Sequence, residues 1–161
     1  AKALRRLGIL FSEGRAKKTY WAVVRGQPPQ ETGRIDFPLT KISSAEKGWR
    51  MVVAKDGEGQ EAITDYRILG TSKTGLTWLE LSPHTGRTHQ IRVHCAQSGF
   101  PILGDPWYGT PEDRSATSEI PLHLHARAIE LPLYPKKPPI RVEADVPEAM
   151  REGFTCCQQN A

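Results

Sequence analysis

The most informative segment of the chain reads Leu81-Ser82-Pro83-His84-Thr85-Gly86-Arg87-Thr88-His89-Gln90-Ile91-Arg92-Val93-His94. Pro83 and Gly86 predict a turn, and a helix is expected after it, from about Thr88 to Ser98. Thr85 or Thr88 is expected to cap this helix, because a short hydroxyl satisfies a free N–H group at a helix start. The density of guanidinium, imidazole and amide donors suits an anionic or hydrogen-bonding ligand.

Helical spacing places Arg92 beside apolar residues. His89, Arg92, Val93 and Ala96 share one face at intervals of three and four residues. An unpaired charge in such a setting is costly, so we expect a carboxylate or phosphate partner for Arg92. From composition alone, a solvated face with one satisfied histidine explains the same residues equally well.

The segment Thr85–Arg92 resembles the third catalytic-domain motif of the RluA-type family of RNA pseudouridine synthases. Three other stretches are similar to elements of that family, in the family's order. They are the active-site tyrosine strand at Lys17–Gly26, the glycine–aspartate–proline turn at Pro101–Gly109 and the leucine–histidine–alanine element at Leu124–Ala126. The resemblance implies an α+β catalytic domain with a mixed, mainly antiparallel sheet and flanking helices. Residues 1–161 would form a single, partial domain of this type.

The sequence departs from the family at one critical point. The family's nucleophilic aspartate lies in a histidine–arginine–leucine–aspartate motif upstream of the tyrosine strand, and the printed sequence contains no such motif. Residues 1–7 look like the middle of a helix, so we expect the natural polypeptide to extend further toward its N-terminus. We therefore expect the 161 residues alone to be inactive, to lack central strands of the sheet and to be marginally stable.

The resemblance also implies roles for individual residues. Arg92 would be the cationic partner of the nucleophilic aspartate outside the chain, and Tyr20 would contact the target base, although composition alone favours a core role for Tyr20. Ile91 would pack beside that base, and no metal or organic cofactor would be needed. The other predicted substrate-binding residues are Arg87, His89 and Lys18. Basic groups among them would meet RNA phosphates, or, for Arg87, simply brace the turn.

Asp105 precedes Pro106 and is expected to bond nearby backbone N–H groups as structural support, not to serve as the nucleophile. His125 is expected to make a structural hydrogen bond, and His94 and Cys95 to be packing residues. His84, His89 and His94 recur every five residues, which does not gather them on one helical face, so no metal site is predicted.

Periodicity and turn residues predict the remaining elements. Helices are expected at 3–11 and after Pro147, strands at 19–24, 35–37, 49–54, 62–69, 76–81, 122–133 and 140–146, a mobile loop at 110–119 and a frayed tail at 155–161. The run of short strands between 35 and 81 predicts a meander with largely antiparallel pairing. Within the first strand, Tyr20 and Ala22 should point to one face, and Trp21 and Val23 to the other.

Composition sets weaker limits. Lys and Arg number 22 against 18 Asp and Glu, and the net charge of +4 is only weak evidence for a nucleic-acid partner. No apolar run is long enough to span a membrane. The three cysteines, an odd number, do not make a disulfide framework or a zinc site, and a reducing cytoplasm is expected.

Three functions remain open from the sequence. The first is an enzyme that isomerises uridines of ribosomal or transfer RNA to pseudouridine, with this chain lacking the nucleophile. The second is a non-catalytic RNA-binding protein that retains the synthase fold. The third is a mixed antiparallel domain in which the arginine and histidine cluster merely holds a loop.

Overall fold

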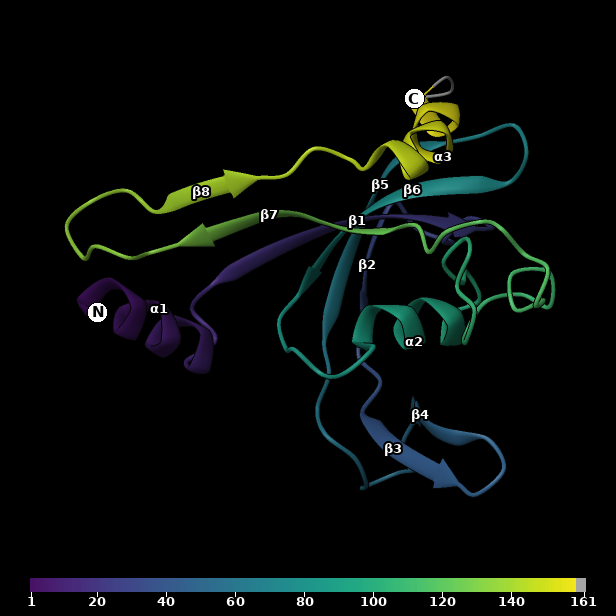
Figure 1. Cartoon of the computed structure of the whole chain (residues 1–161), viewed down its shortest axis with the longest axis horizontal. Helices are drawn as coiled ribbons and strands as arrows, with labels where there is room; N and C mark the ends of the chain where they lie inside the picture. The colour runs from purple at the N-terminus through teal and green to yellow at the C-terminus, as the bar shows by residue number, and fades with distance from the viewer. Residues whose placement is uncertain (159–161) are drawn as a thin grey trace.

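The structure is a computed structural model that describes residues 1–158 of the chain (Figure 1). Its elements run α1 (Lys2–Ser12), β1 (Lys17–Arg25), β2 (Thr32–Ile35), β3 (Leu39–Ser44), β4 (Gly48–Val53), β5 (Thr64–Thr71), β6 (Leu76–Pro83), α2 (Gln90–Gln97), β7 (Leu124–Leu131), β8 (Ile140–Glu143) and α3 (Glu148–Gln158). None of these helices is both long and apolar enough to cross a membrane.

Six strands form one sheet in the order β2-β5-β6-β1-β7-β8, and β3 and β4 form a separate two-stranded sheet. Every pairing between these strands is antiparallel. The predicted α+β class and the largely antiparallel pairing are therefore confirmed. The predicted meander is wrong, because β2 pairs with β5 while the intervening β3 and β4 form a sheet of their own. The expectation that central strands come from outside the chain is wrong for this sheet, because β1 pairs directly with both β6 and β7.

Strand β1 separates two apolar layers, because its side chains alternate between the faces of the sheet. Tyr20, Ala22 and Val24 pack in a cluster that includes Ile91 and Cys95 from α2. On the other face, Trp21 and Val23 pack in a second cluster with Phe154 and Cys157 from α3. Figure 1 shows α2 and α3 on opposite sides of the strands. The predicted alternation along β1 is confirmed, and it places Tyr20 on the α2 side.

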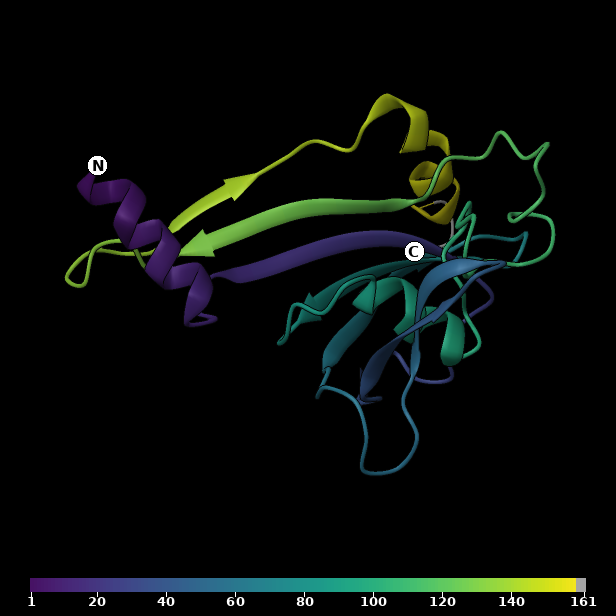
Figure 2. The same ribbon diagram turned by 60° about the horizontal axis from the view of Figure 1, so that its bottom comes forward.

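The sheet is longer on one side than on the other. Figure 2 shows β1, β7 and β8 extending beyond the other strands as an arm, with α1 at its far end. Residues 17–19 of β1 pair with β7 only, since the pairing with β6 starts at Tyr20. Apolar side chains stay exposed along this arm, among them Leu4 in α1 and Val142 in β8.

Some predicted elements are misplaced. The strand expected at 35–37 instead ends at Ile35, because β2 pairs with β5 only over 32–35. Residues 155–158 of the expected frayed tail belong to α3, where the buried Cys157 holds the helix on the sheet, and residues 159–161 lie outside the described residues. The loop at 110–119 is irregular as predicted but is anchored, since buried Asp113 accepts hydrogen bonds from Arg25 at 2.6 and 2.8 Å.

Candidate active site

The turn between β6 and α2 is held together by the buried side chain of Gln90. Its Oε1 accepts hydrogen bonds from the Thr85 hydroxyl at 2.7 Å and from the Arg87 backbone N–H at 3.1 Å. Its Nε2 donates to the Ile63 carbonyl at 3.0 Å and to the Thr64 hydroxyl at 2.9 Å. All of these groups lie around the turn, so one amide fixes its shape. The role of Gln90 could not be predicted from the sequence, because two of its partners, Ile63 and Thr64, lie at the start of β5, far from it in the chain.

The predicted threonine cap of α2 is wrong. The residue at the N-cap position is His89, which has a left-handed backbone with φ of 54° and makes no side-chain cap hydrogen bond. The Thr85 hydroxyl is already used, because it bonds Gln90 and accepts from the Ile63 N–H at 3.0 Å. This left-handed residue turns the chain into α2, three residues before Arg92.

Arg92 is held by a carboxylate within the chain. Its Nε and Nη2 donate to the two oxygens of Asp105 at 2.9 and 2.7 Å, in a bidentate pair. The Asp105 side chain is fully buried, and that of Arg92 is 13% exposed. The predicted carboxylate partner of Arg92 is thus confirmed. Within the folded chain this partner is Asp105, because the turn after Gly104 brings Asp105 against α2. The expectation that Arg92 pairs with an aspartate outside the chain stays a prediction.

Asp105 also accepts hydrogen bonds from the backbone N–H groups of Trp107 and Tyr108, at 2.9 and 3.1 Å, which confirms its predicted structural role. Burial alone would raise the pKa of Asp105, but the hydrogen bonds from Arg92 and from these two amides hold the pKa below its ordinary value. The carboxylate is therefore ionised at neutral pH. Gly104 makes this turn feasible, since its φ is +77° and a Cβ there would collide with the Pro121 carbonyl.

Two histidines, His94 and His125, have the structural roles predicted for them, and a third, His89, lies at the site. His94 is fully buried and bonds the Thr64 hydroxyl, and His125 bonds the Ala144 carbonyl at 2.8 Å, as predicted. His89 instead lies at the site, with its Nδ1 at 2.9 Å from the Tyr108 hydroxyl. Burial, and then the positive charge of Arg92, lower the pKa of His89, so its ring is neutral at pH 7.

A cavity of about 290 Å³ opens beside this cluster. All six predicted site residues line it, although they come from β1, the β6–α2 turn and α2. The lining residues are Lys18, Tyr20, Pro83, Thr85, Gly86, Arg87, His89, Gln90, Ile91, Arg92 and Leu124. Arg87 also braces the turn, because its Nε donates to the Glu61 carbonyl at 2.9 Å. The sequence did not predict the contributions of Pro83 and Leu124 to the cavity wall.

The lining is suited to a flat, polar ring. Tyr20, Ile91 and Leu124 supply aromatic and apolar wall, and Arg92 supplies a fixed positive charge. Within residues 1–158, the hydrogen bonds of Arg92 use only Nε and Nη2, so Nη1 remains for a second acceptor. No three His, Cys, Asp or Glu side chains of this part of the chain are grouped as metal ligands.

Three comparisons show that this antiparallel sheet with its flanking helices is a pseudouridine synthase fold. The RNA pseudouridylate synthase family matches residues 1–97. An uncharacterized RNA pseudouridine synthase of Zymomonas mobilis is 44% identical over 155 residues, and the dual-specificity RNA pseudouridine synthase RluA of Yersinia pestis is 37% identical over 143 residues. The solved structure of human RNA pseudouridylate synthase domain containing 1 matches with a TM-score of 0.73 at 28% identity.

These matches cover nearly all of this chain but only part of each relative. They include 95% and 89% of this chain for the two bacterial proteins and 90% for the human structure. The chain in turn spans 68% of each bacterial relative and 59% of the human chain. The chain belongs to the RluA-type RNA pseudouridine synthase family.

Proposed function

We propose that this chain forms the Arg92 and Tyr20 side of a site that isomerises uridine to pseudouridine in ribosomal or transfer RNA. The observation that supports this most is the placement of Arg92. Asp105 holds its guanidinium in a fixed position at the wall of a cavity that also contains Tyr20 and Ile91. A charge fixed before the substrate arrives needs no reorganisation during the reaction, which is the condition for electrostatic catalysis.

The reaction breaks the bond between ribose C1′ and uracil N1, rotates the base and forms a bond from C1′ to C5. The hydrogen of C5 is lost as a proton, and N1 gains one. We propose that the nucleophilic carboxylate is supplied from outside residues 1–161, since the printed sequence has no histidine–arginine–leucine–aspartate motif. Arg92 Nη1 would face this second carboxylate, so that one guanidinium serves two acids.

The other residues of the cavity would bind and orient the nucleotide. Tyr20 would stack on or contact the extruded uracil, and Ile91 would pack against its edge. Lys18 and Arg87 would meet phosphates at the mouth of the cavity. Extruding a stacked base costs a few kcal/mol, which phosphate contacts of this kind would offset.

The test is to map pseudouridines in ribosomal and transfer RNA from cells with and without the gene. The proposal predicts at least one uridine that is modified only when the gene is present, and that an Arg92→Lys allele leaves unmodified. An unchanged map would contradict it. If the protein then still bound RNA, the non-catalytic binder would be the better account, since Asp105 satisfies Arg92 without any nucleophile.

A further inference from the structure

Two exposed indoles lie together beside the cavity. Trp49 on β4 is 36% exposed and Trp107, in the loop after Asp105, is 42% exposed. Their ring centroids are 5.3 Å apart, and the planes are inclined at 73°. The other two tryptophans of the chain pack against Phe154. Large apolar side chains that remain exposed side by side mark a binding surface more often than a stable free surface.

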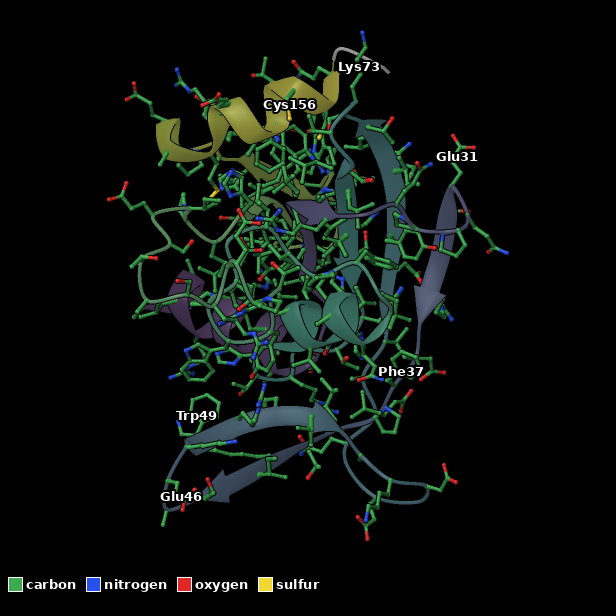
Figure 3. The ribbon with its side chains drawn as sticks, turned by 90° about the vertical axis from the view of Figure 1, so that its right-hand side faces the viewer. Glu31, Phe37, Glu46, Trp49, Lys73 and Cys156 are labelled. Atoms are coloured by element: carbon green, nitrogen blue, oxygen red, sulfur yellow. The ribbon has the colours of Figure 1, made fainter. Side chains whose placement is uncertain are left out.

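His89 connects these indoles to the cavity. Its ring, which lines the cavity, stacks on Trp49 with centroids 5.2 Å apart and planes 25° apart. It also meets the Trp107 ring edge-to-face at 5.1 Å. Figure 3 shows the Trp49 side chain on the side of β4 that faces the rest of the molecule. An aromatic surface therefore runs without a break from the cavity wall to the β3–β4 hairpin.

Positive charge surrounds the same surface. A groove of about 530 Å³ between the hairpin and residues 106–107 is lined by both indoles and by Lys47, Arg50 and Arg114. The Lys41 ammonium lies 4.6 Å from the Trp49 ring centroid. Within residues 1–158, none of these four cations is in an ion pair. One exposed carboxylate, Glu46, lies in the hairpin turn (Figure 3).

We propose that Trp49 and Trp107 form a stacking platform for an unpaired RNA base next to the uridine held in the cavity. Aromatic faces with unpaired cations beside them are the arrangement that binds single-stranded nucleic acid, because bases stack on the rings while phosphates meet the cations. Stacking accepts any base, so the platform would select unpaired RNA and not a particular sequence. The inference rests on the proposed function, since it assumes that the cavity receives a uridine of the same strand.

The experiment measures the affinity of the full-length protein for two fluorescein-labelled strands by anisotropy. One is a 12-nucleotide oligouridylate, and the other is an abasic ribose-phosphate strand of the same length and charge. Wild-type protein should bind the oligouridylate at least tenfold more tightly than the abasic strand. Trp49→Leu and Trp107→Leu should each weaken oligouridylate binding about tenfold and leave binding of the abasic strand unchanged.

Tyr134→Leu is the matched control, because Tyr134 is also an exposed aromatic near cations but lies in the β7–β8 connection. It should change neither affinity. The platform is refuted if both tryptophan variants bind oligouridylate within twofold of wild type. An equal loss on both strands would also refute it, since the indoles would then only support the cations. Binding through the indoles without any pseudouridine formation would contradict the proposed function alone.

Discussion

At the scale of single residues, the site depends on a carboxylate that the sequence assigned to a turn. Asp105 accepts two hydrogen bonds from Arg92 and two from backbone amides. The sequence predicted that Arg92 needs an acidic partner, because burial next to apolar neighbours is a local property of α2. The sequence did not identify Asp105 as this partner. Arg92 and Asp105 are 13 residues apart, and they come together only because the connection Phe100–Gly104 folds back onto α2.

Asp105→Asn is expected to destabilise the chain by about 3–5 kcal/mol, because it leaves the Arg92 charge without an anion inside the protein. Urea unfolding at pH 7 measures this. Asp65→Asn is the matched control. Its bidentate pair with Arg34 is exposed and should be worth no more than about 1 kcal/mol. Equal losses of unfolding free energy in the two variants would show that the buried pair stabilises the protein no more than the exposed pair does.

The buried carboxylates of Asp105 and Asp113 make the free energy of unfolding depend on pH. Burial would raise the pKa values of Asp105 and Asp113, but their arginine partners and other hydrogen bonds hold both values below the ordinary one. The unfolded chain then binds these protons at a higher pH, near 3.9, than the folded chain does. The stabilisation is complete above that pH and is lost as the pH falls through the folded-state pKa values.

The urea midpoint should therefore stay level down to about pH 4 and fall as the pH is lowered from about 4 toward 2, and it should fall less steeply in Asp105→Asn. A midpoint that stays constant over this range in the wild type would contradict the assignment of buried, ionised carboxylates.

At the scale of the elements, the sequence predicted those features of the strands and helices that depend on residues close together in the chain. The alternation along β1 is a property of any strand, so the faces of Tyr20 and Trp21 were predictable. The cap of α2 was not, because Thr85 makes its hydrogen bonds to Ile63 and Gln90 instead. The tail at 155–158 looked frayed since its contacts are with a distant strand. What could not be predicted in each case was a contact between remote segments.

Helix α3 shows how a contact can outweigh intrinsic helix propensity. A Cβ at Gly153 would lie 2.6 Å from ring atoms of His123, which is buried and bonds the Pro121 carbonyl. Gly153→Ala should therefore destabilise the chain by about 1–3 kcal/mol, although alanine is the better helix former. Gly8→Ala in α1 meets nothing within 4 Å and should stabilise that helix by about 0.5–1 kcal/mol. Thermal melts of both variants should shift in opposite directions, and shifts of one sign would contradict this reading.

At the scale of the whole molecule, the arm of β1, β7 and β8 is the exposed part of the structure. Strand β8 is an edge strand, with Ile140 39% and Val142 55% exposed. Although β8 has only four residues, its outer edge and these two exposed apolar side chains offer a place for pairing with another chain. The six strands of the sheet pair without a gap, and the marginal stability expected from the sequence stays a prediction. The arm leaves a surface prone to association.

The 161-residue chain is accordingly expected to self-associate at high concentration, and Val142→Lys should reduce that association. The unfolding free energy should change by less than about 0.5 kcal/mol, since the side chain is exposed. Ala116→Lys adds the same charge in the exposed 110–119 loop and should leave the association unchanged. Sedimentation velocity over a range of concentrations distinguishes these outcomes, and a wild-type chain that stays monomeric throughout would contradict the expectation.

The most direct test is release of tritium from uridine C5 in RNA, because forming the new bond to C5 expels that hydrogen. Full-length wild-type protein should release tritium from ribosomal or transfer RNA. Arg92→Lys, which keeps the charge but loses the bidentate geometry, should lower the rate at least a hundredfold while RNA affinity stays within a few fold. Wild-type protein that releases no tritium from either RNA, or an Arg92→Lys variant as fast as wild type, would contradict the assignment of the cavity as the catalytic site.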